Sequence, residues 1–311
     1  MRYSFIVNPV AGKKNPYLAF FPRISAYMEA RGLAYTCHVT QFPGQASEFS
    51  ADEAGREGPV RIYSVGGDGT LREVAAGAIG RENAEVGAFP CGTGNDYIKT
   101  FGREEDFLSP EKQLAARSRT VDTIRSDSGV SVNLCTVGMD ARVSMLVSRI
   151  KRIPFLSGPV AYDLAMIRTL FGKIGENLKI VIDSIRSYRD VFLMAIACNG
   201  RYYGGGFCPA PTAAPDDGLL DFVLIRKPPF WKIPKLAQMY KAGRHLGARE
   251  FDGILTFCRG KKMEISAARP VAENIDGDCR YVGKEKFSVL PSSLRFLVPK
   301  SGAGTPACGQ L

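Results

Sequence analysis

The sequence is poor in histidine, and its cysteines are not spaced as metal ligands. Only two histidines, His38 and His245, occur in 311 residues, so a histidine-rich metal site is excluded and a Ser-His-Asp triad is disfavoured. The eight cysteines include no C-x-x-C pair, which favours a reducing compartment over a disulfide scaffold or a zinc site. No apolar run approaches the roughly 20 residues that cross a bilayer. We therefore expect a cytoplasmic protein, soluble or peripheral to a membrane.

Acidic residues are scarce in two segments, and this scarcity makes the net charge of +10 local. Residues 141–173 contain six Lys and Arg against one acid, and residues 226–249 contain seven and no acid. Apolar residues repeat at helical spacing from Val160 to Phe171, and the second segment opens with a Pro-Pro-Phe-Trp sequence. Basic amphipathic helices of this kind predict peripheral contact with an anionic membrane surface. The alternative is that their apolar faces pack on the protein while their charges are solvated. No nucleic-acid-binding motif accompanies the charge, so that class of partner is not expected.

Short apolar strands alternate with helical patterns over residues 1–122. The strands are Tyr3–Val7, Ala34–Thr40, Val60–Val65 and Val86–Phe89, and the helices are Phe20–Arg31, Ala46–Arg56, Leu71–Ala78 and Asn95–Phe101. This alternation predicts a parallel sheet with helices on both faces. Ligands bind beyond the carboxyl ends of the strands in such sheets. Turn-forming sequences lie at these ends: Asn8–Gly12, Gly66–Thr70 and Cys91–Asn95.

Strand patterns separated by turns dominate after Thr120. They cover 120–124, 130–137, 178–183, 191–199, 219–225, 255–258, 262–266, 287–290 and 294–298. We expect an all-β second domain, a sandwich or flattened barrel, over residues 123–298, interrupted by the two basic helical insertions. The final strand of this domain could instead pack on the first domain, residues 1–122. The tail 299–311 is expected to be disordered.

The strongest motif is the run Val65-Gly66-Gly67-Asp68-Gly69-Thr70, which follows an apolar strand and precedes a helix. Glycines let the backbone approach a bulky anion closely, and a helix N-terminus favours phosphate. Thr70 is expected to cap the helix that follows. A carboxylate inside such a cradle is sensible if a divalent cation bridges it to phosphates. The run is neither a P-loop nor the G-x-G-x-x-G fingerprint, and taken alone it could be a tight turn.

Two acidic turns mark the second domain. The segment Ala210–Leu219 contains Pro-Asp-Asp-Gly, whose carboxylates and carbonyls suit magnesium, although a plain hairpin turn explains the Asp-Gly pair equally well. The segment Glu273–Asp278 carries three carboxylates around another Asp-Gly pair. One of these acids could act as a general base, but a structural turn is the simpler explanation of this segment alone.

Taken in order, these motifs resemble the diacylglycerol kinase catalytic-domain family, which includes bacterial soluble lipid kinases and the sphingosine and ceramide kinases. The resemblance extends over roughly residues 1–298. It is carried by GGDGTLRE at 66–73, GTGND at 92–96, DDGL at 216–219 and NIDGD at 274–278. It implies an NAD-kinase-like α/β domain, a lipid-binding β-sandwich domain, and an active site in the cleft between them. The implied reaction transfers the γ-phosphoryl group of ATP to a lipid hydroxyl, with Mg²⁺, and converts diacylglycerol to phosphatidic acid.

The resemblance also implies roles for individual residues. Asp68 would act through Mg²⁺ on the phosphates, Asp278 would be the catalytic base, and Asn95, Asp96 and Asp122 would support the polar network. Asp217, with the carbonyls of Ala214 and Leu219, would bind a second, structural Mg²⁺. The implied ATP-binding residues are Asn8, Pro9, Val10, Ala11, Gly12, Thr40, Gly66, Gly67, Asp68, Gly69, Thr70, Leu71, Arg72 and Thr93.

The sequence departs from the family pattern at three places. Val10-Ala11 replaces a frequent hydroxyl residue, Arg72 replaces a frequent Asn, and Asp278 replaces the usual Glu, which is one methylene longer. Because of the departure at Asp278, a second function stays open: a catalytically weak regulatory protein that binds a nucleotide or a lipid. A kinase of another lipid, such as a sphingoid base, ceramide or a different glycerolipid, is the nearer alternative. The oligomeric state is open, with a homodimer among the options.

Overall fold

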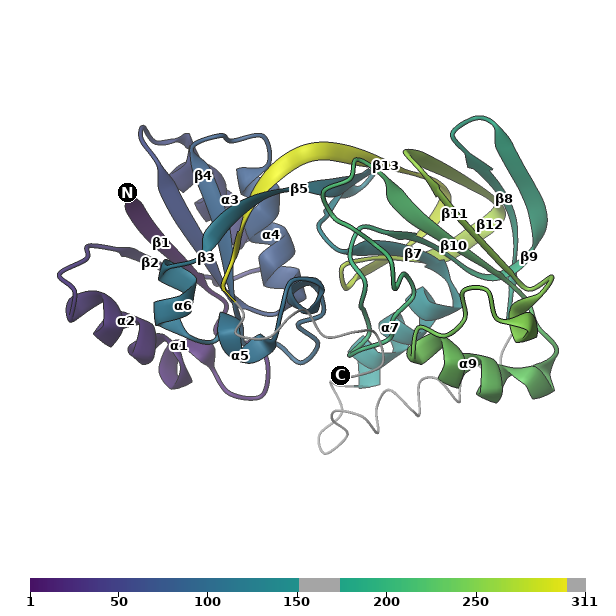
Figure 1. Cartoon of the computed structure of the whole chain (residues 1–311), viewed down its shortest axis with the longest axis horizontal. Helices are drawn as coiled ribbons and strands as arrows, with labels where there is room; N and C mark the ends of the chain where they lie inside the picture. The colour runs from purple at the N-terminus through teal and green to yellow at the C-terminus, as the bar shows by residue number, and fades with distance from the viewer. Residues whose placement is uncertain (151–173, 301–311) are drawn as a thin grey trace. The chain divides into compact units, whose positions relative to one another are not determined.

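The computed structural model describes residues 1–150 and 174–300, which form two compact units (Figure 1). Unit 1 combines Met1–Thr123 with Gly200–Gly218 and the chain from Leu290 on, and unit 2 combines Ile124–Asn199 with Leu219–Val289. The domain boundary drawn near residue 122 thus lies beside the end of the first segment of unit 1. The expected domains were continuous stretches of sequence, whereas the chain returns to unit 1 twice, at Gly200–Gly218 and from Leu290 on.

Unit 1 contains a parallel sheet in the order β4-β3-β1-β2. Its strands are β1 (Arg2–Val7), β2 (Thr36–Val39), β3 (Val60–Gly66) and β4 (Ala84–Pro90). The last part of β13 (Asp278–Val298) adds to the β4 edge in parallel, with Phe296 opposite Val86. The final strand therefore packs on the first unit, one of the arrangements that the sequence allows.

Helices cover both faces of this sheet (Figure 1). They are α1 (Pro16–Ala19), α2 (Phe21–Glu29), α3 (Gln45–Gly55), α4 (Asp68–Ala78), η1 (Tyr97–Thr100), α5 (Glu104–Phe107) and α6 (Pro110–Leu114). Phe5 and Val7 pack with Ile24 of α2, whereas the fully buried Ile6 between them points to the face that carries α3 and α4. The strands are apolar on both sides because both sides are buried.

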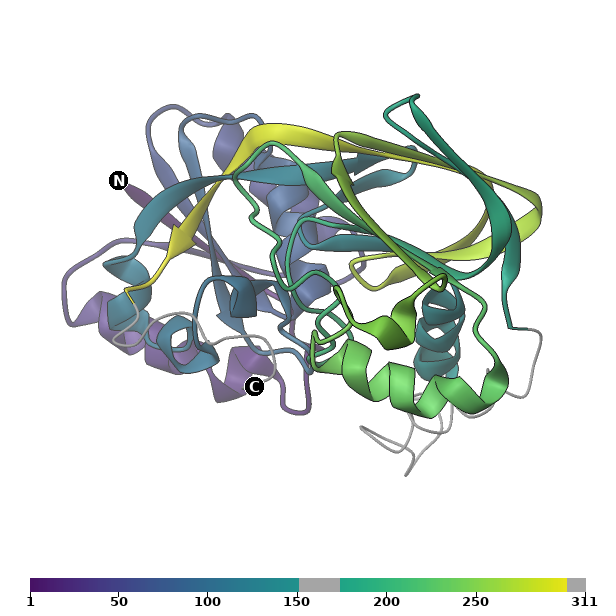
Figure 2. The ribbon, with the colours of Figure 1, turned by 45° about the vertical axis from the view of Figure 1, so that its right-hand side comes forward.

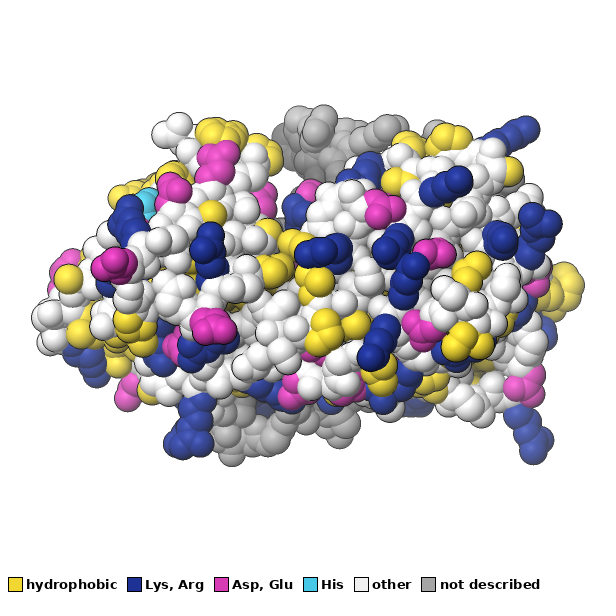
Figure 3. All heavy atoms as spheres, turned by 90° about the horizontal axis from the view of Figure 1, so that it is seen from above, with side chains coloured by type: hydrophobic (Ala, Val, Ile, Leu, Met, Phe, Trp, Pro, Cys, Tyr) yellow, Lys and Arg dark blue, Asp and Glu magenta, His cyan; other side chains and the backbone are white. Residues whose placement is uncertain are grey.

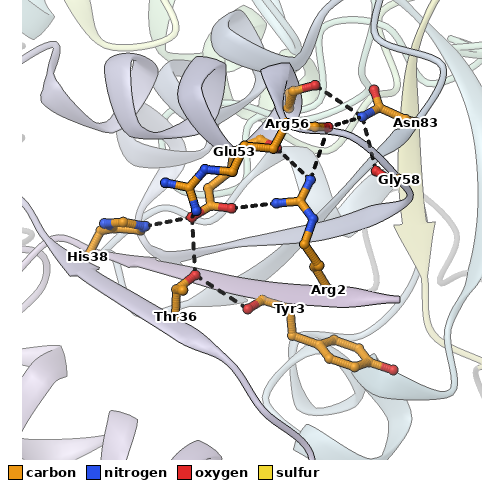
Figure 4. Close-up of polar contacts among 9 residues, drawn as sticks. Arg2, Tyr3, Thr36, His38, Glu53, Arg56, Gly58 and Asn83 are labelled. Atoms are coloured by element: carbon orange, nitrogen blue, oxygen red, sulfur yellow. Dashed lines mark hydrogen bonds and ion pairs between the residues drawn. The ribbon is translucent and has the colours of Figure 1, made fainter.

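A polar cluster around Glu53 fixes α3 to the first two strands (Figure 4). The Glu53 carboxylate, 3% exposed, accepts from Arg2 Nη1 at 2.8 Å and lies 3.0 Å from His38 Nε2. Arg56 Nη1 is 3.2 Å away and the Thr36 hydroxyl 3.3 Å. Because Arg2 begins β1, this cluster marks the amino-terminal end of the sheet, and its cations offset the desolvation of the buried acid.

Unit 2 is built from antiparallel strands around one apolar core. The strands are β6 (Gly129–Ser131), β7 (Leu134–Gly138), β8 (Glu176–Ile182), β9 (Arg186–Cys198), β10 (Leu220–Arg226), β11 (Leu255–Gly260), β12 (Lys262–Ile275), the start of β13 and the end of β5 (Arg117–Ser126). β7 and β8 each pair with both β9 and β12, so these strands wrap around a core that includes Phe192, Phe222 and Phe287. The all-β second domain is confirmed.

After β7, the described residues contain the helices α7 (Met139–Ile150), η2 (Phe230–Lys232), α9 (Ile233–Lys241) and η3 (Arg249–Phe251). Most of the first basic segment, including Val160–Phe171, lies outside the described residues. Within the described ranges, we find no helix long and apolar enough to cross a membrane. Six cysteines in these ranges are free thiols: Cys37, Cys91, Cys135, Cys198, Cys258 and Cys279.

Candidate active site

The three turn sequences at the carboxyl ends of β1, β3 and β4 lie against one another. Gly12 has φ +70°, and a Cβ there would sit 2.1 Å from the carbonyl oxygen of Cys91. A Cβ on Gly92 would sit 2.5 Å from the Cα of Gly67. Side chains at these positions would force the loops apart, so glycine is required for their close approach. The loops form one continuous backbone surface at the edge where ligands bind in such sheets.

Thr70 holds two of these loops together and does not cap the helix. Helix α4 begins at Asp68, with Gly67 as its N-cap, so Thr70 lies inside the first turn. Its hydroxyl accepts from Asn8 Nδ2 at 3.1 Å, and a Cβ on Gly66 would meet the same oxygen at 2.4 Å. The expected cap was wrong because the glycine pair lets the helix begin three residues earlier, with Gly67 rather than Thr70 as its N-cap. Thr40 joins the same edge of the sheet through its amide, which donates to the carbonyl of Val7 at 2.9 Å.

Asp68 occupies the first position of α4, where the helix dipole favours a negative charge. Its Oδ1 accepts from the amides of Asp96 at 2.8 Å and Tyr97 at 3.2 Å, which fixes the carboxylate against the third loop. A Cβ on Gly94 would lie 3.0 Å from Asp68 Oδ2 and 3.2 Å from Asp96 Oδ2. Two carboxylates therefore flank one glycine.

Asp96 is tied to residues that the sequence did not identify. Its Oδ1 accepts from Lys99 Nζ at 2.6 Å, and its Oδ2 accepts from the amide of Gly205 at 2.8 Å. Lys99 also donates to the carbonyl of Gly94 at 2.8 Å. Gly205 lies in a hairpin in which Gly204 and Gly206 also have positive φ. Three consecutive glycines were the available signal, but their partner is more than 100 residues away.

Asn95 shapes the third loop. It has φ +51°, its Oδ1 accepts from the amide of Gly92 at 3.0 Å, and its Nδ2 donates to Glu104 at 3.1 Å. The expected helix over 95–101 is only the short η1, because Asn95 adopts the left-handed conformation there. Thr93 is exposed at the loop, in reach of solvent.

The remaining residues of the expected ATP set differ in what they offer. Val10 is 85% exposed, and Pro9 and Ala11 are partly exposed beside it, all in the first loop. The side chain of Leu71 is 3% exposed and packs in the core, which leaves only its backbone for a ligand. Gly69 and Arg72 follow Asp68 in the first turns of α4.

Asp122 anchors another part of unit 1. Its carboxylate accepts from the amides of Gly218 at 2.7 Å and Ser292 at 2.8 Å, and its own amide donates to the carbonyl of Pro215. It thereby joins β5, the Pro215–Gly218 turn and β13, a positioning role. Asp217 is exposed on this turn, whereas Asp216 pairs with Arg119 at 2.5 Å.

The second magnesium site remains a prediction. Ala214 and Asp217 belong to unit 1, and Leu219 is the first residue of the following segment of unit 2. No group of three or more His, Cys, Asp or Glu side chains is placed to bind a metal in the described ranges. The predicted site needs only one carboxylate and two carbonyl oxygens.

In unit 2 the Asp-Gly turn between β12 and β13 separates two acids with different surroundings. Asp276 (φ +44°) and Gly277 (φ +103°) form a two-residue hairpin turn. Asp276 accepts from the amides of Val132 at 2.7 Å, Leu134 at 3.0 Å and Asn133 at 3.3 Å. Asp278, the first residue of β13, is exposed. Of the two, Asp278 is the more exposed residue.

The third acid of this segment, Glu273, is fully buried. Its carboxylate pairs with Arg280 Nε at 2.6 Å and lies near Glu285, another buried acid. Burial raises the pKa of Glu273 to about 7, and the Arg280 hydrogen bond offsets this only in part. Glu273 is therefore a structural acid of the core, with a neutral form near physiological pH.

The residues of unit 1 fit a nucleotide and a divalent cation. The loops present backbone to a ligand at positions where a Cβ would collide with the neighbouring loop. The Asp68 and Asp96 carboxylates offer the hard oxygen ligands that Mg²⁺ prefers, next to a helix N-terminus that favours phosphate.

Comparison with known proteins agrees with this arrangement. Residues 2–126 match the model of the diacylglycerol kinase catalytic domain, and residues 133–298 match that of the YegS C-terminal NAD kinase beta sandwich-like domain. A protein named probable lipid kinase YegS-like from Pseudomonas aeruginosa PAO1 is 30% identical over 285 residues, 91% of this chain and 89% of that protein. The diacylglycerol kinase of Bacillus subtilis is 22% identical over 306 residues, 97% of this chain and 98% of its own.

A crystal structure of a diacylglycerol kinase from Bacillus anthracis has the same fold. Its TM-score is 0.69 at 17% identity, over 96% of this chain and 97% of that one. The two matched models cover the α/β part and the β-sandwich part of the chain in that order. The chain belongs to the diacylglycerol kinase catalytic-domain family, with a YegS-type β-sandwich domain.

Proposed function

We propose that this protein transfers the γ-phosphoryl group of ATP to the hydroxyl of a membrane lipid, with Mg²⁺, and that diacylglycerol is the acceptor. One observation carries the proposal: three loops of unit 1 converge around the Asp68 and Asp96 carboxylates, in a chain of the lipid kinase family. The diacylglycerol kinase names of relatives that span nearly the whole chain support this acceptor.

The chain's own groups then have distinct tasks. Amides of the Asn8–Gly12, Gly66–Thr70 and Cys91–Asn95 loops bind the phosphates, and the Asp68 and Asp96 carboxylates would hold the divalent cation. The bound cation would supply charge neutralisation at the phosphates. Positioning and charge neutralisation supply most of the rate in phosphoryl transfer.

Asp278 is the proposed general base. Its carboxylate takes the proton of the lipid hydroxyl as that oxygen forms its bond to the γ-phosphorus and the bond to the β-phosphate oxygen breaks, leaving ADP. A base must come within about 3 Å of the proton, or reach it through one water. The shorter side chain of Asp278 makes the water-mediated route the more accessible one.

Phosphate transfer from labelled ATP to a lipid panel tests the proposal. The panel contains diacylglycerol, monoacylglycerol, sphingosine and ceramide, presented in mixed micelles, with and without Mg²⁺. We expect labelled phosphatidic acid, no product after chelation, and the greatest rate with diacylglycerol. Transfer chiefly to a sphingoid base or ceramide would replace the acceptor, and ATP binding with no transfer to any lipid would favour a regulator.

A further inference from the structure

The start of the second basic segment carries the most exposed large aromatic side chain in the described residues. Trp231 is 78% exposed and Phe230 is 56% exposed, and both belong to η2. Removing an aromatic side chain from water is strongly favourable, so the exposure of Phe230 and Trp231 side by side needs an explanation.

The apolar face of the following helix does not provide it, because that face is already used. Ile233, Leu236 and Tyr240 of α9 are buried. Tyr240 also packs on the buried His245, with ring centroids 4.9 Å apart. The alternative that the apolar face of this segment packs on the protein is therefore right for α9. Phe230 and Trp231 precede that face and do not share its burial.

The backbone holds the aromatic pair outward. Pro228 is buried, and the amide of Lys227 donates to the carbonyl of Val191 at 2.9 Å, which fixes the chain to β9. The prolines at 228 and 229 restrict φ before η2 begins, so the pair projects from a stiff support. A loose loop could fold its aromatic residues inward, but this one has little freedom to do so.

Positive charge follows the pair along the chain. Exposed cationic side chains follow it along the segment: Lys232, Lys235, Lys241, Arg244 and Arg249. Glu250 pairs with Lys235 at 3.0 Å, and this hydrogen bond lowers the pKa of Glu250, so the acid stays charged and offsets one cation. The face of the molecule in Figure 3 differs from this basic segment in its charge, because Lys and Arg are interspersed there with Asp and Glu.

We propose that Phe230 and Trp231 form a wedge that enters the interface of an anionic lipid bilayer, with the exposed Lys and Arg side chains of the same segment on the headgroups. Trp is enriched at the level of lipid headgroups because its ring is amphipathic, and anionic lipids attract clustered cations. The proposal deepens the proposed function, on which its purpose rests, by naming the surface that brings the enzyme to its substrate. It commits to a membrane, and an acidic protein or nucleic acid would be revealed by the test.

The chain offers a direct probe, because Trp231 is its only tryptophan. Intrinsic fluorescence of the full chain is recorded without ATP as vesicles of phosphatidylglycerol and phosphatidylcholine are added. We expect a shift of the emission maximum to shorter wavelength, and quenching when the acyl chains carry bromine. Pure phosphatidylcholine vesicles should give at most a weak response, and added salt should reverse binding to the anionic vesicles.

Variants separate the wedge from the charge. Lys232→Gln and Lys241→Gln should each lower the vesicle partition coefficient about fivefold at low salt, as expected for one cation near an anionic surface. Phe230→Ser should weaken sedimentation with anionic vesicles by tenfold or more, the loss expected for a buried aromatic ring. The matched control is Ile185→Ser, which removes an 85% exposed side chain from the β8–β9 turn. This turn and α9 lie at opposite ends of unit 2 (Figures 1 and 2), so the control should bind as the parent does.

Two outcomes would overturn the proposal. One is vesicle binding with Trp231 emission unchanged and unaffected by brominated lipid. The other is a blue shift produced equally by heparin or a soluble acidic protein, which would assign the surface to a different partner. Because the assay contains no ATP, insertion without phosphoryl transfer would leave docking intact and refute only the proposed function. Transfer to short-chain diacylglycerol without insertion would do the reverse.

Discussion

The aspartates beside glycines in unit 1 and in unit 2 are held by different sets of hydrogen bonds. In unit 1, Asp68 accepts from backbone amides of the third loop while it also faces Gly94 beside Asp96. In unit 2, Asp276 accepts from three amides, and the neighbouring Asp278 is exposed. Unit 1 thus combines anchoring and candidate chemistry in one residue, whereas unit 2 divides them between two residues.

This difference predicts how each acid responds to substitution. An acid with both roles has to keep its geometry when its charge is removed, which favours Asn as the informative variant. Where the roles are divided, one substitution should affect stability and the other only activity. The following predictions test that division.

The largest expected effect is on activity. Asp68→Asn keeps an oxygen for the amides of Asp96 and Tyr97 but removes the charge, so kcat/KM should fall about 100-fold or more, with a higher Mg²⁺ requirement. Asp278→Asn should lower kcat by about 100-fold without changing the Mg²⁺ requirement. Steady-state kinetics across a Mg²⁺ titration measure both. Asp52→Asn, an exposed acid of α3, is the control, and an unimpaired Asp278→Asn enzyme would contradict its role as base.

The second effect is on stability. Asp276→Ala leaves three amides of residues 132–134 without their charged acceptor, and it should lower the free energy of unfolding by about 4 kcal/mol. Urea denaturation measures it, with Asp252→Ala, an exposed turn acid of unit 2, as the control within about 0.5 kcal/mol of the parent. A loss for Asp276→Ala no larger than that of the control would remove the anchoring role.

The third effect is a pH dependence. Glu273 has a pKa raised by burial from 4.5 to about 7. Above pH 4.5 the unfolded chain releases this proton while the folded protein keeps it, so the free energy of unfolding falls as pH rises through this window. The total should be on the order of 3 kcal/mol. Glu273→Gln keeps a hydrogen-bond acceptor for Arg280 and should flatten this part of the urea stability profile. An unchanged slope would show that Glu273 ionises normally.

The smallest effect concerns an ion pair at the surface. Arg119 and Asp216 join β5 to the turn that carries Asp217, but their side chains are 48% and 33% exposed. Water and salt screen such a pair, so Arg119→Gln should change the free energy of unfolding by less than about 1 kcal/mol. Thermal unfolding at low and high salt checks this. A larger loss of unfolding free energy would mean that the Arg119–Asp216 pair, rather than Asp122, holds the turn in place.

Local patterns predicted most of the fold. The strand and helix positions of residues 1–90 follow from periodicity and turn residues, and they agree with the structure within a few residues. The segments 287–290 and 294–298 looked like two strands because Pro291 and two serines separate them. The structure has the single strand β13, in which Ser292 takes φ +51° and donates its amide to Asp122. That acceptor lies 170 positions away, so no local pattern could reveal it.

The candidate site was also predictable only where its residues are neighbours in the sequence. Asp68 and the glycines were found because their pattern is contiguous. Gly205 was missed because its partner Asp96 is 109 positions away in the sequence. Lys99 is only three positions from Asp96, but no motif marks this pair. The different surroundings of Asp276 and Asp278 were also hidden, because the three amides that bind Asp276 come from residues 132–134.

The interleaved composition of unit 1 has a consequence for how the protein is made. The ribosome releases β1 to β4 early, but β4, which pairs with β3, lacks the neighbour on its other edge until β13 emerges. Phe296 then packs on Tyr97 and Phe101. Until that moment an apolar sheet edge is open to other chains. We expect an expressed fragment of residues 1–123 to aggregate, and nascent chains to need chaperone protection until the last strand is synthesised.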